Sequence, residues 1–210
     1  MGVTLVQTDR SVVLRRTVGV VLGAIIVAAA AQVSIPLPGT PVPMTLQPMA
    51  VLLVGGLLGA RLGALSMILY LAMGAAGLPV FTPTVPLVGV ARLLGPTGGY
   101  LLAYPVAAYV VGLFVAPGLA RGLGQAERNG VGDAARQPGV STPWLRTVLG
   151  VVSGLLLIHI GGLAQLAILT GDLSAAARFG TVPFLLGDLI KLAVLVPVLT
   201  KLTPTIRARL

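Results

Sequence analysis

The segment Pro183-Phe-Leu-Leu-Gly-Asp-Leu-Ile-Lys-Leu192 carries two opposite charges, Asp188 and Lys191, near the start of the last long apolar run. The run continues to Leu199 and is otherwise typical of a membrane-spanning helix. Residues three apart lie on one face of a helix. A charge in hydrocarbon costs several kcal/mol, so it must face a partner, a cavity or water. The pair therefore predicts a polar site enclosed by a membrane bundle; the alternative is an internal ion pair that only fixes helix packing.

The composition indicates an integral membrane protein. The chain has 210 residues, of which 56% are hydrophobic and 9% charged, whereas a soluble domain has about 25% charged residues. Apolar runs and short connections use nearly the whole length, so we expect residues 1–210 to form a single membrane-embedded substrate-binding domain in the lipid bilayer. The chain has no cysteine, which excludes disulfides and thiolate metal sites.

The apolar runs predict an all-α, polytopic membrane protein with six transmembrane helices. The predicted spans cover residues 18–33, 45–59, 62–78, 100–119, 147–169 and 182–202. A cleaved signal peptide is the alternative for the first run, but its length favours a retained span. Residues 121–146 are the most polar segment, and we expect 171–181 to be a short polar loop.

The net charge of +9 indicates topology and not nucleic-acid binding, because the basic residues lie at the ends of the apolar runs. Six spans put both termini on one side. That side would hold Arg10, Arg15, Arg16, Arg61, Arg121, Arg128, Arg136, Arg146, Lys201, Arg207 and Arg209. The other side would hold only Arg92 and Arg178. The positive-inside rule then places both termini in the cytoplasm.

With this orientation, residues 34–45, 79–99 and 170–182 face outward. Asp188 would lie roughly 8 Å below the start of the sixth helix, in a cavity closed by the proline-rich first loop and by the loop that carries Arg92. An ammonium, a guanidinium and a carboxylate there suit one small polar ligand. His159, the only histidine, predicts either a proton relay or a bond to a neighbouring helix.

Other motifs carry weaker signals. Ala24 and Ala28 have the small-xxx-small spacing that allows close helix approach, inside the bundle or against another subunit. Tyr100 and Tyr104 fit interfacial anchors. The chain has no phosphate loop, no His/carboxylate cluster with metal spacing and no nucleophile motif. We therefore expect no catalytic residue, no metal and no cofactor, and not an enzyme.

Five stretches together resemble the BioY family. They are Pro43-Met-Thr-Leu-Gln47, Gly59-Ala-Arg-Leu-Gly63, Tyr70-Leu-Ala-Met-Gly-Ala-Ala-Gly-Leu-Pro-Val-Phe81, Leu94-Gly-Pro-Thr-Gly-Gly-Tyr100 and Pro183-Phe-Leu-Leu-Gly-Asp-Leu-Ile-Lys191. The resemblance covers about residues 18–202. It departs at Thr82-Pro-Thr-Val-Pro86, where many relatives have a glycine-rich stretch.

The resemblance implies the biotin-capture subunit of an energy-coupling factor transporter in the cytoplasmic membrane of a prokaryote. A separate transmembrane coupling protein and two cytoplasmic ATPases would supply the energy. It implies that Asp188, Lys191 and Arg92 bind biotin and that Ala24 and Ala28 dock on the coupling protein. We add Gly98 and Tyr100 as candidate binding residues. Open alternatives are a subunit for another vitamin, a stand-alone proton-coupled carrier or channel, and a membrane protein without a ligand.

Overall fold

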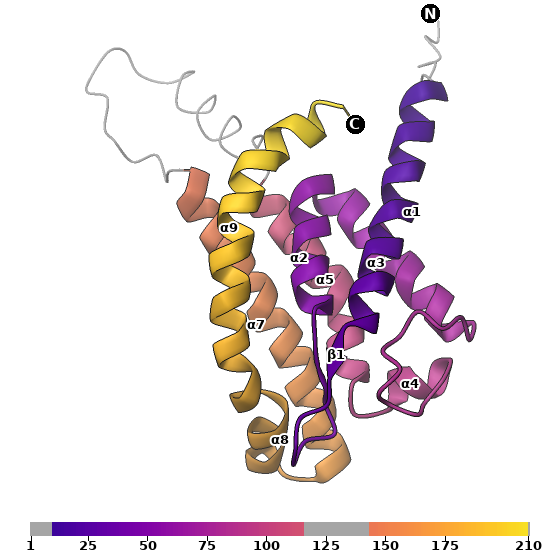
Figure 1. Ribbon diagram of the computed structural model, residues 1–210, viewed down its shortest axis with the longest axis vertical. Coiled ribbons are helices and arrows are strands. Elements are labelled where there is room, and N and C mark those ends of the chain that lie inside the picture. The colour runs from indigo at the N-terminus through magenta and orange to yellow at the C-terminus, as the bar shows by residue number, and fades with distance from the viewer. Residues whose placement is uncertain (1–9, 116–142, 210) are drawn as a thin grey trace, which may run out of the picture.

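The computed structural model describes residues 10–115 and 143–209 and shows a helical bundle with one short hairpin (Figure 1). Within these ranges, six helices have 12 or more residues: α1 Arg10–Gln32, α2 Gln47–Leu58, α3 Ala60–Ala75, α5 Gly98–Phe114, α7 Pro143–Thr170 and α9 Leu185–Arg207. Residues 116–142 lie outside the described residues and include the end of the predicted span 100–119 and most of the polar segment 121–146.

Among the residues that the structure describes, three helical segments are long and apolar enough to cross a membrane, namely Arg10–Gln32, Trp144–Thr170 and Leu173–Arg207. The apolar helices α2, α3 and α5 are shorter. The boundaries differ from the sequence prediction chiefly at two helices. α1 begins at Arg10 and not at residue 18, because apolar patterning marks only the membrane part of a helix that starts in polar sequence. α9 covers Leu185–Arg207 and not 182–202, because Val182–Phe184 form a separate 3₁₀ turn that includes Pro183 and the helix continues past the apolar run to Arg207.

Two segments that were predicted to be loops contain regular secondary structure. The proline-rich loop forms an antiparallel hairpin in which β1 (Ser34–Ile35) pairs with β2 (Met44–Thr45). Proline favours extended backbone, which suits such a ribbon. The expected polar loop at 171–181 instead contains the helix α8, Leu173–Gly180. The Asp172 side chain caps this helix by accepting a hydrogen bond from the Ser174 amide at 2.8 Å.

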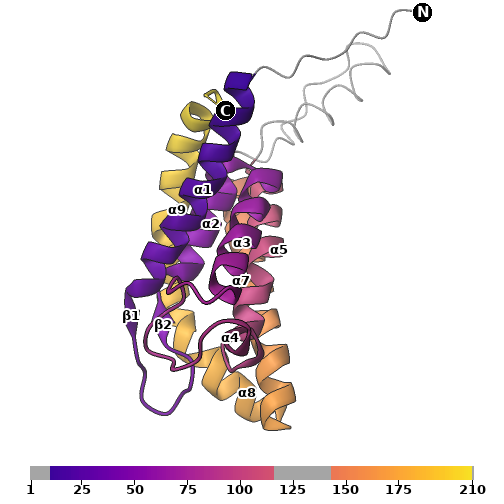
Figure 2. The same ribbon diagram turned by 90° about the vertical axis from the view of Figure 1, so that its right-hand side faces the viewer.

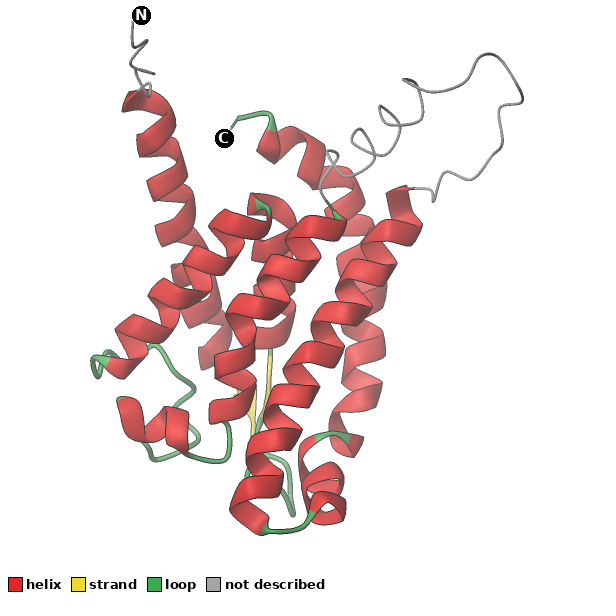
Figure 3. Ribbon diagram, turned by 180° about the vertical axis from the view of Figure 1, so that it is seen from behind, coloured by secondary structure: helices red, strands yellow, loops and turns green. Residues whose placement is uncertain are grey.

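Both described ends of the chain lie at one end of the bundle, and the hairpin, α4 (Val90–Leu94) and α8 lie at the other (Figures 1 and 2). Arg15 Nη1 of α1 donates to the carbonyl oxygen of Arg209, just after the end of α9, at 3.3 Å. Seen from behind, the two strands are visible between the helices, on the far side of the bundle (Figure 3). We call these the terminal end and the hairpin end.

Glycines allow the helices to approach closely. A Cβ atom on Gly99 of α5 would lie 2.1 Å from the carbonyl oxygen of Gly161 on α7, so no larger residue fits at that crossing. Gly59 has φ +88°, which permits the tight turn between α2 and α3. At the terminal end, Arg207 Nη2 donates to the carbonyl oxygens of Gly56 at 2.6 Å and Gly112 at 3.3 Å, tying α9 to the ends of α2 and α5.

Candidate functional site

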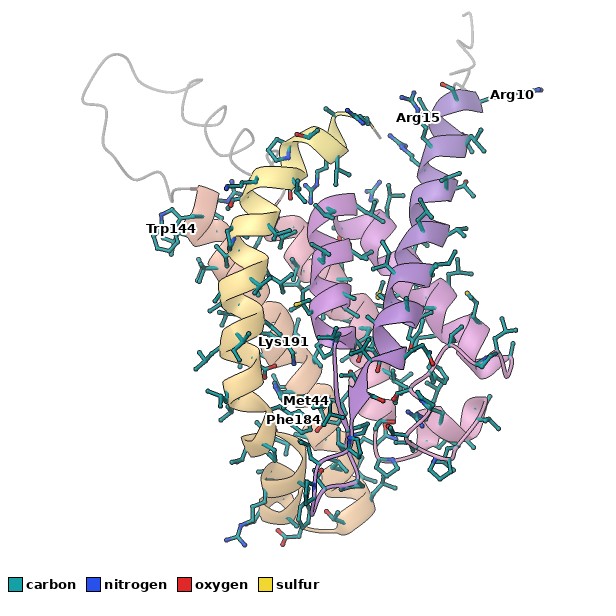
Figure 4. All side chains as sticks on the ribbon, viewed as in Figure 1. Arg10, Arg15, Met44, Trp144, Phe184 and Lys191 are labelled. Atoms are coloured by element: carbon teal, nitrogen blue, oxygen red, sulfur yellow. The ribbon has the colours of Figure 1, made fainter. Side chains whose placement is uncertain are left out.

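A cavity at the hairpin end collects residues from the hairpin, the 79–97 loop and four helices. Its empty volume is about 600 Å³, counting the part open to solvent. Its walls are formed by Val42, Pro43, Thr45, Gln47, Pro48, Thr82, Arg92, Thr97, Tyr100, Leu101, Tyr104, Leu155, Ile158, His159, Phe184, Asp188 and Lys191. Figure 4 shows Lys191 and Phe184 near Met44 of the hairpin, at this end of α9.

Asp188 forms the centre of a charged cluster in this cavity. Its Oδ1 accepts a hydrogen bond from Lys191 Nζ at 2.8 Å, and its Oδ2 lies 2.6 Å from His159 Nε2 on α7. Asp188 and Lys191 are 9% and 7% exposed. The ion pair leaves the two side chains with no net charge, and Asp188 lies in the first turn of α9, where the helix dipole favours an anion. These contacts explain how both charges are tolerated inside an apolar bundle.

Asp188 lies closer to a helix end than the sequence prediction placed it. Since α9 begins at Leu185, Asp188 is in its first turn and roughly 4.5 Å from its start. The prediction assumed a helix that began at residue 182, but the turn at Val182–Phe184 has a different geometry. From this position the Asp188 carboxylate contacts both Lys191 and His159.

Arg92 lines the same cavity, but it is more deeply placed than expected. The sequence analysis expected it on an outer loop, whereas it is only 1% exposed. Its Nη1 donates to the carbonyl oxygen of Val85 at 2.6 Å, and its Nη2 donates to that of Thr82 at 3.1 Å. Burial lowers the pKa of the Arg92 guanidinium from its ordinary value, yet an arginine remains charged in proteins. Arg92 thus holds its own loop and presents a cation to the cavity.

Tyr100 lines the cavity, and Gly98 does not. The Tyr100 hydroxyl donates to the carbonyl oxygen of Gly180 at 2.6 Å, which fixes the end of α8 to α5. A Cβ atom on Gly98 would lie 1.8 Å from the carbonyl oxygen of Leu93, so this glycine permits the tight junction of α4 and α5. The interfacial-anchor interpretation is wrong, because Tyr100 and Tyr104 are 8% and 3% exposed and belong to the core.

We expect Tyr100→Phe to lower the melting temperature and weaken ligand binding. The change leaves the buried Gly180 carbonyl without its donor, at a cost of about 1–3 kcal/mol. Thermal unfolding in detergent and a ligand titration measure the two effects. Tyr109→Phe is the matched control, because Tyr109 lies on the same helix and is 41% exposed. Equal behaviour of the two variants would contradict the structural role of the Tyr100 hydroxyl.

Ala24 faces the interior of the bundle. It is 0% exposed, and Ala28 is partly buried against the same core. The buried stripe of α1 comprises Gly23, Ala24, Val27 and Ala31. The close helix approach predicted for this spacing therefore occurs inside the chain at Ala24, which other parts of the chain cover.

Most cavity residues were absent from the predicted site, and two of them, His159 and Gln47, make polar contacts that link different helices. His159 was noticed as the only histidine, but its acidic partner is distant in sequence and is brought to it only by the packing of α7 on α9. Gln47 was part of a quoted motif without an assigned role. Its Nε2 donates to the Tyr70 hydroxyl at 2.6 Å, and that hydroxyl donates to the carbonyl oxygen of Val80 at 3.2 Å. This chain connects α2 and α3 to the loop that holds Arg92.

Unpaired polar atoms concentrate around the cavity. In the described parts of the chain, five buried side-chain nitrogen or oxygen atoms have no hydrogen-bond partner, and three belong to cavity residues: Arg92 Nε, Thr97 Oγ1 and His159 Nδ1. Buried polar groups in native proteins nearly always have partners. A polar molecule in the cavity would supply them.

Comparison with known proteins agrees with this arrangement. The sequence model of the BioY family matches residues 5–208. The probable biotin transporter BioY of Pyrococcus horikoshii is 33% identical over 183 residues, covering 87% of this chain and 93% of that protein. The biotin transporter BioY of Thermotoga maritima is 36% identical over 169 residues, covering 80% of this chain and 84% of that protein.

A solved structure extends the agreement to the fold. The crystal structure of the S-component for biotin from an ECF-type ABC transporter superposes with a TM-score of 0.72 and 25% identity. The superposition covers 93% of this chain and 94% of that one. With the family match over nearly its whole length and these relatives, the chain belongs to the BioY family.

Proposed function

We propose that this protein captures biotin for uptake across the membrane of a prokaryote, as the substrate-specific subunit of an ECF-type ABC transporter. It is a transporter component and not an enzyme. The observation that carries the proposal is the cavity at the hairpin end, where Asp188, Lys191, His159 and Arg92 from three parts of the chain line one space. Membership of the BioY family supports biotin over other vitamins.

The chemistry of the cavity suits biotin, which has an apolar bicycle, a ureido group and a carboxylate. Asp188 accepts a ureido N–H, because a carboxylate has about four lone-pair sites and only two are used here. Lys191 donates to the ureido oxygen. Arg92 binds the carboxylate, with Nε as its unpaired donor. Tyr104, Leu101 and other apolar side chains cover the hydrocarbon part of the ligand. The reversed pose, with the carboxylate on Lys191, is the alternative.

The six long helices would form six transmembrane spans, in a single substrate-binding domain with both termini in the cytoplasm. α2 has 12 residues and spans about 18 Å, so it needs the hairpin to complete its passage through a core of about 30 Å. Arg10, Arg15 and Arg207 lie at the terminal end, and Arg92 and Arg178 lie on the hairpin-end elements. This asymmetry supports the orientation.

Single cysteines test the orientation, because the natural chain has none. We expect a membrane-impermeant maleimide to label Ser174→Cys on α8 in intact cells and Arg61→Cys only after the membrane is opened. Both positions are exposed, so the contrast reports topology and not burial. The opposite labelling pattern would place the cavity on the cytoplasmic side and contradict uptake from outside.

A transmembrane coupling protein and two cytoplasmic ATPases would supply the energy, because this chain contains no phosphate loop. Docking through Ala24 and Ala28 requires α1 to move first, since Ala24 is covered by the rest of the chain. Co-purification of the coupling protein with the unaltered chain, and its loss with Ala28→Trp, would support docking on this part of α1.

A stand-alone proton-coupled carrier is the second candidate, and the 2.6 Å contact between His159 and Asp188 favours it specifically. Proteoliposomes that contain only this chain separate the two functions. The proposed function predicts biotin binding without accumulation when no ATPase is present. Accumulation driven by a pH gradient alone would establish the carrier.

Direct titration of the purified protein tests biotin capture. Isothermal calorimetry should give one biotin per chain, with no response to thiamine or riboflavin at the same concentrations. Tryptophan fluorescence is a poor reporter, because Trp144, the only tryptophan, is 56% exposed at the terminal end (Figure 4). The absence of biotin binding, or equal binding of another vitamin, would refute the assigned substrate.

A further inference from the structure

His159 has one ring nitrogen engaged and one without a partner. Its Nε2 lies 2.6 Å from Asp188 Oδ2, while Asp188 Oδ1 holds Lys191 Nζ at 2.8 Å. An ionised carboxylate only accepts hydrogen bonds. Asp188 is ionised because it forms an ion pair with Lys191. The hydrogen of the short contact therefore resides on His159 Nε2, and Asp188 fixes the tautomer of the ring.

The other nitrogen, Nδ1, is then an acceptor. It is buried and has no hydrogen-bond partner among the described residues, although His159 lines the cavity. The rings of Tyr100 and Phe184 lie nearby, with centroids 6.4 and 6.5 Å from the centre of the imidazole. Neither ring satisfies Nδ1, because the Tyr100 hydroxyl donates to Gly180 and phenylalanine has no donor. An N–H group of a bound molecule would satisfy it.

Asp188 is the one carboxylate among the residues that line the cavity, and it is already paired with Lys191. The other titratable or charged groups there are Arg92 of α4 and Tyr100 and Tyr104 of α5. In the tautomer that donates from Nε2 to Asp188, Nδ1 is an acceptor, whereas an imidazolium would donate from both nitrogens.

We propose that His159 is a ligand-binding residue whose Nδ1 accepts a hydrogen bond from one ureido N–H of biotin, with Asp188 holding the ring in the required tautomer. The inference rests on the proposed function. It gives Asp188 a second task, because the carboxylate orients both His159 and Lys191 toward the ligand. It also makes binding selective, since a ligand that presents an acceptor or a methyl group at this point leaves Nδ1 unpaired.

Two matched variants separate the two nitrogens. In His159→Gln the side-chain amide reaches the position of Nε2 and keeps a donor for Asp188, but nothing replaces Nδ1. In His159→Asn the amide oxygen lies near the position of Nδ1, and the contact with Asp188 is lost. We expect His159→Gln to bind biotin about 10- to 100-fold more weakly than the unaltered protein, with His159→Asn less affected. The reverse order would show that only the Asp188 contact matters and would overturn the proposal.

A measurement without substitution uses the fact that the chain has one histidine. Selective ¹⁵N-histidine labelling then gives one Nδ1 and one Nε2 resonance by NMR. We expect an unprotonated Nδ1 in the free protein and a change of the Nδ1 resonance on addition of biotin. A proton on Nδ1, or an unchanged Nδ1 resonance in the biotin complex, would overturn the proposal. Failure of the unaltered protein to bind biotin would instead refute the proposed function and this assignment together.

Discussion

Asp188→Asn should reduce biotin affinity by at least about 100-fold and lower the stability of the protein, because it removes the only carboxylate from the cavity. The side chain of Lys191 would remain buried without its counter-ion, and breaking a buried ion pair in this way costs about 3–5 kcal/mol. His159 Nε2 would also lose the acceptor that sets its tautomer. Calorimetric titration and thermal unfolding in detergent measure the two consequences.

A second substitution separates stability from binding. Asp188→Asn combined with Lys191→Met removes the unpaired charge, so the double variant should recover much of the lost stability and none of the biotin affinity. Asp172→Asn is the matched control, because Asp172 carries the same group on the exposed cap of α8. Unchanged biotin affinity in a folded Asp188→Asn protein would remove Asp188 from the binding site.

The methyl ester of biotin should bind more weakly than biotin itself only in proteins that retain Arg92. In the unaltered protein, we expect the methyl ester to bind roughly 10- to 100-fold more weakly than biotin, because it loses a charge-assisted hydrogen bond. Arg92→Gln should bind acid and ester with similar affinity. In Lys191→Met, the ratio of the affinities for biotin and its methyl ester should be the same as in the unaltered protein. A titration of each protein with both ligands checks the pose.

The ratio of the two affinities is informative because Arg92 also has a structural role. Its Nη1 and Nη2 hold the carbonyl oxygens of Val85 and Thr82, so Arg92→Gln will loosen the loop and weaken both ligands. The ratio cancels that common loss. Arg178→Gln, on exposed sequence of α8, should leave the ratio unchanged. If the difference in affinity between biotin and its methyl ester is lost in Lys191→Met and retained in Arg92→Gln, the reversed pose is established.

The sequence predicted those features that depend on local spacing. Asp188 and Lys191 share a helix face because they are three residues apart, and the structure joins them at 2.8 Å. The apolar runs located the long helices to within a few residues at most ends. The proline-rich segment was expected to be a loop that closes the cavity, and it forms the hairpin whose Thr45 and Pro43 line the cavity.

Features that depend on tertiary packing were beyond the sequence analysis. The contact of His159 with Asp188 requires the relative rotation of α7 and α9, which no local pattern encodes. The buried Tyr100 hydroxyl has its hydrogen-bond acceptor on α8. That helix was not predicted, because its segment has a polar composition typical of a loop. The spacing of Ala24 and Ala28 predicted a close approach without its partner, and the structure places Ala24 inside the bundle.

Protection of a cavity cysteine by biotin tests the location and the ligand together. Leu155→Cys places the only thiol of the protein on the α7 wall of the cavity, and Ser174→Cys provides an exposed thiol on α8. With biotin at about 100 times its dissociation constant, only about 1% of the protein is free, so alkylation of Leu155→Cys by a small methanethiosulfonate should slow by about two orders of magnitude. Alkylation of Ser174→Cys should not change. Unprotected Leu155→Cys in a protein that still binds biotin would place the ligand elsewhere and contradict the account.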